Sequence, residues 1–356
     1  MRVIELVSNK VWGGGERYVL DLCKALRADG ADVEIYTRGI EAVDHRFKAE
    51  DFTPGKMSLG GLFGLRASLQ LARRLRHING PVTIHVHNFK DAEMAVNARS
   101  LAGVPREDVR IVCTRHLVKP AKKSSVYAQL DALIFVSELA RDEFMRTKPE
   151  VNPDTVHVIH NSIQTQAAPK PSFSDGDELK LLFLGRINPE KGLDTLLHAM
   201  NLLPAELPVS LKIAGTGDEA YIRLLKSIVS QGVADVEWLG NVDNVYAEIA
   251  KCDVGVVPSR ARESFGLVLL EFMSQGKPVI STDNGAQTEI ITDGVEGILV
   301  PPESPRDLAD AIERLANDKK LLASMGTAAL RRFDDNFTYE KFYTRIKVVL
   351  SAPSEK

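Results

Sequence analysis

Residues 179–200 read LKLLFLGRINPEKGLDTLLHAM and contain one repeating unit of the fold. The apolar run Leu179–Leu184 predicts a buried strand, and a loop rich in Gly, Pro and charged residues follows it. A helix-like stretch then separates this run from the next apolar run, Val209–Ala214. Strand, helix and strand in this order predict parallel strands joined by a crossover helix.

The same alternation extends along most of the 356 residues. In the first half, the expected strands are Arg2–Ser8, Asp32–Thr37, Val82–His87, Arg110–Arg115, Leu133–Ser137 and Val156–Ile159. In the second half, they are Leu179–Leu184, Val209–Ala214, Asp235–Leu239, Asp253–Val257, Pro278–Ser281 and Gly297–Val300. We therefore expect an α/β protein with two Rossmann-like, doubly wound parallel sheets. Such sheets bind ligands at the carboxyl ends of their strands, so two of them in tandem predict an interdomain cleft.

The alternation breaks once, at QTQAAPKPSFSDGDE, residues 164–178, where prolines and small polar residues predict a linker. This break predicts an N-terminal domain over 1–163 and a C-terminal domain over 179–337. Beyond it, Tyr339, Phe342 and Ile346 recur at the spacing of a final amphipathic helix, from about residue 338 to 356.

The composition, 44% apolar and 26% charged with a net charge of −3, excludes a disordered chain, a collagen and a coiled coil. No apolar run reaches the ~18 residues of a membrane-spanning helix. The N-terminus reads as a strand interrupted by Glu5 and not as a signal peptide. The three cysteines lie in separate apolar contexts without metal-ligand spacing, which favours reduced thiols in a cytoplasmic protein.

The charge is unevenly distributed. Lys56–Lys123 contains 13 basic and 4 acidic residues, which suits an anionic surface or substrate and equally a solvated face. Within it, Ser58–His77 combines Leu62, Phe63, Leu69 and Leu75 with Arg66, Arg73, Arg74 and Arg76. A basic amphipathic helix of this kind lies on an anionic membrane or packs its apolar face on the sheet, and the sequence leaves both open.

Two glycine-rich turns could hold a phosphate. In Trp12-Gly13-Gly14-Gly15-Glu16, glycines between a strand and a helix allow backbone N–H groups to approach an anion, although a tight turn alone also explains them. The stretch 215–220, GTGDEA, matches the dinucleotide pattern G-x-G-x-x-A, and Glu237 follows about twenty residues later. However, it follows the second strand of its domain, so we expect a turn lining the cleft rather than a nicotinamide or flavin site.

Two stretches of the second half carry charges where a ligand is expected. Arg186 and Lys191 project from the loop after Leu179–Leu184, where two cations could offset the charge of a diphosphate. After Asp253–Val257, Glu263 precedes a helix expected over Phe265–Ser274 and capped by Ser264 or Glu263. Its first N–H groups would form an anion site, and Glu271 lies about two turns further along.

The order of these blocks resembles the retaining glycosyltransferases of family four, which have the GT-B fold. The resemblance covers nearly the whole chain, and its two most specific blocks are those around Arg186 and Glu263. In that fold the last helix crosses back to the N-terminal, acceptor-binding domain. The matching segments are GGGE (13–16), TRH (114–116), GRINPEKG (185–192), AGTGDE (214–219), LGNV (239–242) and ESFGLVLLEFMSQGKPVIST (263–282).

The resemblance implies a nucleotide-diphosphate sugar bound mainly by the C-terminal domain. It places Arg186 and Lys191 on the diphosphate and Glu263 near the reacting carbon of the sugar. Glu271 would bind the ribose hydroxyls, and Val242 would lie at the base. The backbone would contact the distal phosphate and sugar at Ser264, Phe265, Gly266 and Leu267. From the N-terminal domain, Gly13 and Gly14 would face the diphosphate, and His116 would lie beside the donor sugar.

The implied reaction moves a sugar from a donor such as a UDP-sugar to a hydroxyl of a glycan or glycolipid, with retention of configuration. We expect an acceptor in bacterial envelope polysaccharide synthesis (lipopolysaccharide or capsule), with peripheral contact to the inner face of the plasma membrane. No cofactor, metal ion or nucleic acid is expected, and the D-x-D match at 175–177 is interpreted as solvated. Two alternatives remain, a nucleotide-sugar epimerase on a similar scaffold and a non-catalytic nucleotide-sugar-binding protein.

Overall fold

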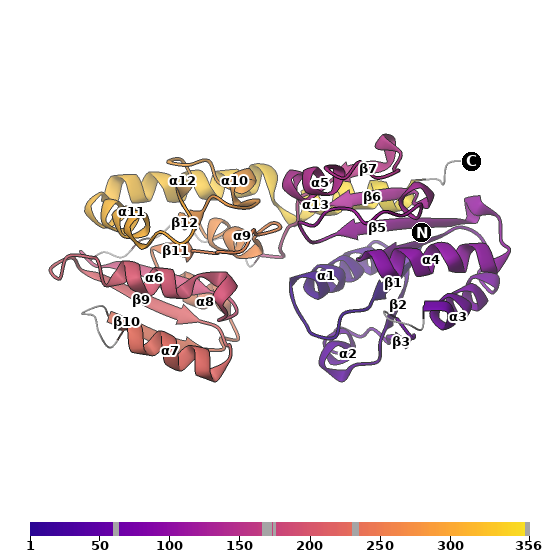
Figure 1. Ribbon diagram of the computed structural model, residues 1–356, viewed down its shortest axis with the longest axis horizontal. Helices are drawn as coiled ribbons and strands as arrows, with labels where there is room; N and C mark the ends of the chain where they lie inside the picture. Colours follow the sequence, from indigo (N-terminus) through magenta and orange to yellow (C-terminus); the bar gives the residue numbers. More distant parts are fainter. Residues whose placement is uncertain (60–63, 166–172, 174–175, 230–234, 353–356) are drawn as a thin grey trace. The chain divides into compact units, whose positions relative to one another are not determined.

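The computed structural model describes residues 1–59, 64–165, 173, 176–229 and 235–352 (Figure 1). The chain forms two compact units, Met1–Asn161 with Glu340–Lys356, and Ser162–Tyr339. Each unit has its own parallel sheet and its own apolar core. Most of the expected linker, residues 166–172 and 174–175, lies outside the described residues.

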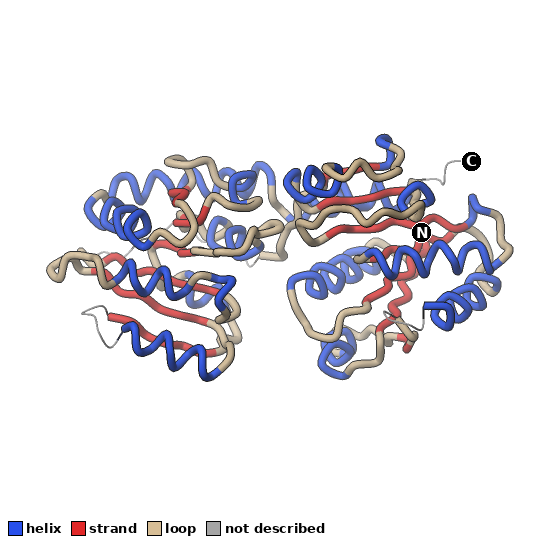
Figure 2. The backbone as a smooth tube through the Cα atoms, in the orientation of Figure 1, coloured by secondary structure: helices blue, strands red, loops and turns tan. Residues whose placement is uncertain are grey.

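The N-terminal unit contains a seven-stranded sheet in the order β3-β2-β1-β4-β5-β6-β7, with every neighbouring pair parallel. Its strands are β1 (Arg2–Val7), β2 (Asp32–Thr37), β3 (Gly55–Lys56), β4 (Val82–Val86), β5 (Val109–Arg115), β6 (Ala132–Phe135) and β7 (Val156–Val158). Helices flank the strands (Figure 2). They are α1 (Gly14–Ala28), α2 (Glu41–Lys48), α3 (Gly64–Arg76), α4 (Phe89–Ala102), α5 (Glu138–Met145) and α13 (Tyr339–Ser351), with short 3-10 turns at η1 (Arg106–Asp108), η2 (Tyr127–Gln129) and η3 (Pro153–Thr155).

The C-terminal unit contains a six-stranded parallel sheet in the order β10-β9-β8-β11-β12-β13. Its strands are β8 (Leu179–Leu184), β9 (Val209–Ala214), β10 (Asp235–Gly240), β11 (Val254–Val257), β12 (Val279–Thr282) and β13 (Gly297–Val300). Its helices are α6 (Leu193–Met200), α7 (Glu219–Val229), α8 (Val245–Ile249), α9 (Leu267–Met273), α10 (Gln287–Ile290), α11 (Pro305–Asn317) and α12 (Lys319–Asn336), with a 3-10 turn at η4 (Pro189–Lys191).

All twelve expected strands are present, with ends that differ by two residues at most, so the predicted class of two doubly wound sheets is confirmed. The added strand β3 has only two residues, too few for a periodic pattern to reveal it. In each sheet the strand order reverses once, between β1 and β4 and between β8 and β11. These two points are where an open α/β sheet is expected to bind a ligand.

Helix α13 closes the chain against the N-terminal sheet. The hydroxyl of Thr83 in β4 donates a hydrogen bond to the carbonyl oxygen of Leu350 over 2.9 Å. The Arg110 side chain, from β5, reaches the carbonyl oxygen of Val349 at 3.2 Å. Because Ile346 and Leu350 are fully buried, the final segment contributes to the core of the unit in which the chain begins. Within the described part of the chain, every helix is too short or too polar to cross a membrane.

Candidate functional site

The loop after β8, residues 185–192, holds its shape through one side chain and one glycine. The side-chain oxygen of Asn188 accepts a hydrogen bond from the Lys191 N–H over 3.2 Å and caps the turn η4. Gly192 then adopts φ +65°, and a Cβ atom there would lie 2.0 Å from the carbonyl oxygen of Pro258. Only glycine fits this contact, which brings the loop after β8 against the loop after β11.

A second close approach explains the G-x-G-x-x-A stretch after β9. A Cβ atom on Gly215 would lie 1.8 Å from the carbonyl oxygen of Gly185, and one on Gly217 would lie 1.9 Å from that of Ile187. Both glycines therefore allow the loop after β9 to pack directly against the loop after β8. This packing accounts for the glycine spacing without a bound dinucleotide.

Lys191 and Glu263, predicted from separate blocks of sequence, are in direct contact. The Lys191 Nζ atom lies 2.5 Å from Oε1 of Glu263, and the Ser259 hydroxyl donates to the same oxygen over 2.6 Å. The two charged side chains are 29% and 17% exposed, so water screens their attraction only in part. Lys191 is thus neutralised by Glu263 in this structure, whereas Arg186 on the same loop is exposed.

The backbone around Glu263 is fixed by the loop after β12. The Ala286 N–H donates to the carbonyl oxygen of Glu263 over 3.0 Å. A Cβ atom on Gly285 would lie 2.5 Å from the backbone nitrogen of Glu263, so a larger residue would displace it. Sequence reasoning missed Ser259 and Gly285, although both follow a strand of the sheet at its carboxyl end.

Arg260 connects the two main loops of the site. Its backbone N–H donates to the carbonyl oxygen of Glu190 over 2.9 Å, and its guanidinium forms an ion pair with Asp194 at the start of α6. These contacts reinforce the approach of Gly192 to Pro258, so the loops after β8 and β11 form one connected structure.

The start of helix α9 differs from the sequence-based expectation. The helix begins at Leu267 and not at Phe265, and its N-cap is Gly266 in a left-handed conformation with φ +99°. The predicted side-chain cap by Ser264 or Glu263 is wrong, because the Glu263 carboxylate is engaged by Lys191 and Ser259. Phe265 is buried and packs edge-on against Phe337, with ring centroids 6.2 Å apart.

The remaining C-terminal candidates lie on other elements. Glu271 is in the middle of α9 and is almost fully buried, at 6% exposure. Val242 is half-buried and lies two residues beyond β10, the edge strand of the sheet. The structure therefore brings Lys191 and Glu263 into contact and places Val242 at the far edge of the same sheet.

In the N-terminal unit, Gly13 is the N-cap of α1 and Gly14 is its first residue. Gly13 has an extended backbone with φ −159°, a conformation open to any residue. The first turn of this helix already contains the buried acid Glu16, whose carboxylate accepts a hydrogen bond from the Asn9 side chain. A carboxylate near a helix N-terminus is stabilised by the helix dipole.

His116 follows β5 and is half-buried. Its Nε2 atom lies 3.1 Å from Nδ1 of His87, and the Tyr18 ring packs edge-on against it with centroids 4.8 Å apart. Burial, and then the neighbouring His87, lower the pKa of His116 well below its usual value. The ring is therefore neutral at pH 7 and acts through hydrogen bonds rather than through charge.

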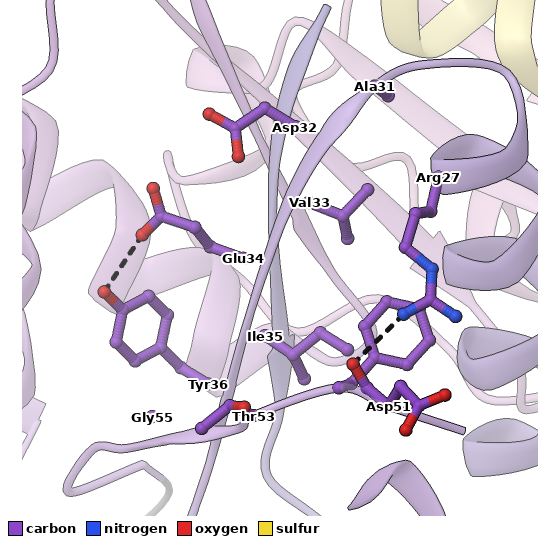
Figure 3. A pocket seen from close by; sticks show the side chains of 11 residues that line it. Arg27, Ala31, Asp32, Val33, Glu34, Ile35, Tyr36, Asp51, Thr53 and Gly55 are labelled. Carbon is purple, nitrogen blue, oxygen red and sulfur yellow. Dashed lines mark hydrogen bonds between the residues drawn. The ribbon is translucent and has the colours of Figure 1, made fainter.

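A pocket of about 450 Å³ opens elsewhere in the N-terminal unit, beside β2 (Figure 3). Its polar groups bond within the protein, because the Arg27 guanidinium donates to the Asp51 carbonyl oxygen and the Tyr36 hydroxyl to the Glu34 carboxylate. The predicted site residues are not among its lining residues, which are Arg27, Ala31, Asp32, Val33, Glu34, Ile35, Tyr36, Asp51, Phe52, Thr53 and Gly55.

Two family models match the chain, one for each half. The model described as Glycosyltransferase Family 4 matches residues 12–167, and the model described as Glycosyl transferases group 1 matches residues 164–332. Together they span residues 12–332, which include every predicted site residue.

Similar proteins and structures agree with these matches. A phosphatidyl-myo-inositol mannosyltransferase of Mycobacterium leprae is 29% identical over 90% of this chain and 89% of that protein. An uncharacterized glycosyltransferase of Methanocaldococcus jannaschii is 32% identical, over 56% of this chain and 54% of that protein. The crystal structure of Anabaena HepE in complex with UDP superposes with a TM-score of 0.82 and 19% identity, over 99% of this chain and all of that one. That likeness confirms the fold.

The contact at Gly192 yields a test of the site's architecture. We expect Gly192→Ala to lower the free energy of unfolding by more than about 2 kcal/mol, because it adds a clash with Pro258 to the backbone cost of a positive φ. Chemical denaturation measures the change. The matched control is Gly80→Ala, which shares a positive φ, +81°, in open space and should lose about 1 kcal/mol. Equal losses in the two variants would contradict the proposed close packing.

Proposed function

Because the chain belongs to glycosyltransferase family 4, we propose that it transfers a hexose from a nucleotide-diphosphate sugar to a hydroxyl of a glycan or glycolipid. The transfer proceeds with retention of the anomeric configuration and without a metal ion. The observation that carries this proposal is the contact between Lys191 and Glu263. It joins the loops after β8 and β11, the two strands at which the order of the C-terminal sheet reverses.

Each charged group has a part in the proposed site. Arg186 and Lys191 bind the diphosphate, and the backbone from Ser264 to Leu267 contacts the distal phosphate and the sugar. Glu263 faces the reacting carbon, held in place by Lys191 and by Ser259. The other assignments follow the family resemblance, with Glu271 at the ribose, Val242 at the base, Gly13 and Gly14 at the diphosphate and His116 at the donor sugar.

In the proposed reaction, the bond between the anomeric carbon and the diphosphate oxygen breaks, and a bond to the acceptor oxygen forms on the same face of the sugar. The departing diphosphate takes the proton of the acceptor hydroxyl. Negative charge grows on the diphosphate as positive charge develops on the sugar. Cations fixed before the reaction stabilise the first charge, and the Glu263 carboxylate lies where it can stabilise the second.

The donor nucleotide is proposed to be UDP. HepE, which shares the fold, was crystallised with UDP, and this supports UDP as the donor nucleotide here. The region after β10, around Val242, is proposed to bind the base. Its residues do not by themselves identify which base is bound.

The acceptor is proposed to be a lipid-linked envelope glycan, reached at the cytoplasmic face of the membrane. Helix α3 buries Leu71 and Leu75 inside the unit, so much of its apolar face packs on the protein. Leu65 and Leu69 remain 69% and 41% exposed. Leu62 and Phe63, the other apolar residues of this segment, lie outside the described residues.

The exposed leucines of α3 lie beside cations that could meet anionic lipid. Arg66 and Arg73 are exposed and share the helix face of Leu65 and Leu69 by their spacing. Arg74 is instead paired with Glu34, and Arg76 donates to backbone carbonyls at the end of α4. The name of the mycobacterial relative, a phosphatidyl-myo-inositol mannosyltransferase, supports a lipid acceptor for a protein of this type.

Removing a diphosphate cation tests the proposed function. We expect Arg186→Ala to lower donor turnover about 10²–10³-fold with unchanged thermal unfolding, since this side chain stabilises the leaving group and is exposed. The control is Arg223→Ala on α7, where the arginine side chain is 71% exposed and should have no catalytic effect. Near-normal turnover of a folded Arg186→Ala protein contradicts the assignment. Conversion of the donor to its epimer without transfer to any added acceptor would support the epimerase instead.

Thermal unfolding with UDP-, GDP- and ADP-glucose tests the proposed nucleotide. A ligand at ~100 times its dissociation constant stabilises a folded protein by ~2.7 kcal/mol. We expect the largest increase in melting temperature with UDP-glucose and a smaller one for Lys191→Ala. A larger increase in melting temperature with GDP- or ADP-glucose would identify that nucleotide sugar as the donor instead of UDP-glucose. No increase with any of the three would contradict nucleotide-sugar binding.

Sedimentation with vesicles tests the membrane contact. We expect vesicles containing anionic lipid to pull the protein down at low salt and to release it at ~1 M salt, because screening weakens the attraction of Arg66 and Arg73. Replacing both Leu65 and Leu69 by Asp should abolish binding. Leu224→Asp on α7, where the leucine is 60% exposed, is the control. If the unmodified protein stays in solution at low salt, the membrane contact is wrong.

A further inference from the structure

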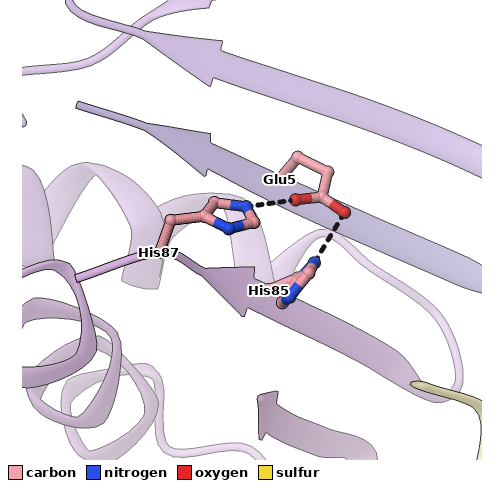
Figure 4. Close-up of side chains that lie close together, drawn as sticks. All are labelled: Glu5, His85 and His87. Carbon is pink, nitrogen blue, oxygen red and sulfur yellow. Dashed lines mark hydrogen bonds and ion pairs between the residues drawn. The ribbon is translucent and has the colours of Figure 1, made fainter. Parts of the chain in front are cut away.

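A buried acid lies between two histidines at the point where the N-terminal strand order reverses (Figure 4). Glu5 in β1 is fully buried, and its direct neighbour across the strand pair is His85 in β4. The Oε1 atom of Glu5 lies 2.9 Å from Nδ1 of His85, and the Oε2 atom lies 2.9 Å from Nε2 of His87. Each carboxylate oxygen thus has its own histidine partner.

The contacts continue outward from both histidines. The second ring nitrogen of His85, Nε2, lies 2.7 Å from the hydroxyl oxygen of Thr114. The second ring nitrogen of His87, Nδ1, lies 3.1 Å from Nε2 of His116. Five side chains therefore form one hydrogen-bonded row across β1, β4 and β5, which begins at the fully buried Thr114 and ends at the half-buried His116.

The protons of this row can be placed from its chemistry. Burial raises the pKa of Glu5, but His85 and His87 outweigh burial and lower that pKa to about 2. Glu5 is therefore ionised at neutral pH and can only accept hydrogen bonds. Each histidine must donate the proton of the nitrogen that faces it, which for His87 is Nε2.

The position of the proton on His116 follows from the position of the proton on His87. Burial, and then His85, lower the pKa of His87, so its ring is neutral and carries only one proton. With that proton on Nε2, the Nδ1 atom of His87 is an acceptor, and the Nε2 atom of His116 must donate to it. His116 is neutral as well, which leaves its own Nδ1 with a lone pair.

We propose that Glu5 and His87 are positioning residues that hold His116 in the Nε2–H tautomer, so that its Nδ1 atom accepts a hydrogen bond from a hydroxyl group of the bound substrate. A neutral imidazole otherwise exchanges between two tautomers, only one of which presents an acceptor at a given nitrogen. The buried Glu5 carboxylate, acting through His87, leaves only one of the two tautomers favourable for His116. The role of the hydroxyl partner rests on the proposed function, whereas the tautomer does not.

The groups packed around the row are consistent with this role. The Tyr18 ring of α1 packs edge-on against both His87 and His116, which fixes the planes of the two rings. Arg115, the last residue of β5, disfavours a positive charge on His116. The row therefore has an ionised carboxylate, Glu5, inside the core and a neutral, oriented ring, His116, at its half-buried end.

A metal ion bound by the three middle residues of the row, Glu5, His85 and His87, is the competing interpretation. Ligand atoms of Glu5, His85 and His87 all lie within 4.8 Å of one another, a spacing that a divalent cation also permits. However, hydrogen-bond partners already face both ring nitrogens of His85 and of His87. The arrangement is satisfied as a hydrogen-bonded row, and the test below separates the two interpretations.

Nitrogen NMR of the full-length chain labelled with ¹⁵N-histidine reads the tautomer directly, because protonated and unprotonated ring nitrogens have well-separated shifts. The His116 signals are identified by their loss in His116→Asn. We expect protonated Nε2 and unprotonated Nδ1 in the unmodified protein without substrate. Glu5→Gln should give a mixture of tautomers, because an amide can donate as well as accept. His87→Phe, which keeps a ring against Tyr18, should do the same and replaces Glu5→Gln if that variant does not fold.

Thr114→Val is the matched control. It removes the hydrogen bond at the opposite end of the row with little change in volume, so His116 should keep its single tautomer. A protonated Nδ1 in the unmodified protein, or an unchanged His116 in both Glu5→Gln and His87→Phe, overturns the proposal. Retention of one equivalent of Zn²⁺ after dialysis, with its loss in Glu5→Gln, overturns it in favour of a metal site.

Kinetics separate this inference from the proposed function. We expect Glu5→Gln to lower kcat about 10- to 100-fold with little change in KM for the donor, as removal of a supporting partner behind a functional histidine does in metal sites. If the unmodified protein transfers no sugar but shows the expected tautomer, the proposed function fails and the positioning row stands. If transfer is normal in a folded Glu5→Gln protein, the positioning role fails and the proposed function stands.

Discussion

The candidate site of the C-terminal unit depends on direct contact between backbone atoms of neighbouring loops. At Gly192, Gly215 and Gly217, a carbonyl oxygen lies 2.0 Å, 1.8 Å and 1.9 Å from where a Cβ atom would be, so no side chain fits there. Through these contacts the loops after β8, β9 and β11 pack directly against one another by their backbones. The contact between Lys191 and Glu263 then follows from where the loops lie, and Arg260 and Asp194 reinforce it.

This arrangement changes what the charged residues can do. A lysine paired with a half-buried carboxylate is held at one position, and it contributes little net charge until an anion adds a second partner. Arg186 is the exposed cation of the same loop, so in the proposed reaction it is the group that an arriving diphosphate would meet first. The contacts with Lys191 and Ser259 also hold the Glu263 carboxylate in one orientation, which the proposed stabilisation of a developing positive charge requires.

The sequence predicted the strands well because buried parallel strands are continuous apolar runs, such as Leu179–Leu184. The sequence-based prediction was wrong where a local preference, such as a helix cap, competed with a contact between residues distant in the sequence. Ser264 or Glu263 was expected to cap helix α9, but Glu263 bonds Lys191, 72 residues earlier in the chain, and Gly266 is the N-cap instead. The row at Glu5 had one visible signal, a charged residue inside an apolar strand, but its partner His87 lies 82 residues away.

The two units have a common feature, a glutamate paired with a basic side chain, that becomes visible only when their two sheets are compared. In each sheet, a buried or half-buried glutamate lies near the carboxyl end of the strands at which the order reverses, Glu5 at β1 and β4 and Glu263 after β11 beside β8. In each case a basic side chain from the neighbouring strand or its loop faces that carboxylate, His85 in one and Lys191 in the other. An acid left alone at such a depth would be costly, so each partner must be kept if the acid is kept. The acid and its partner therefore act as a unit, and the roles proposed for His116 and Lys191 both depend on carboxylates far away in the sequence.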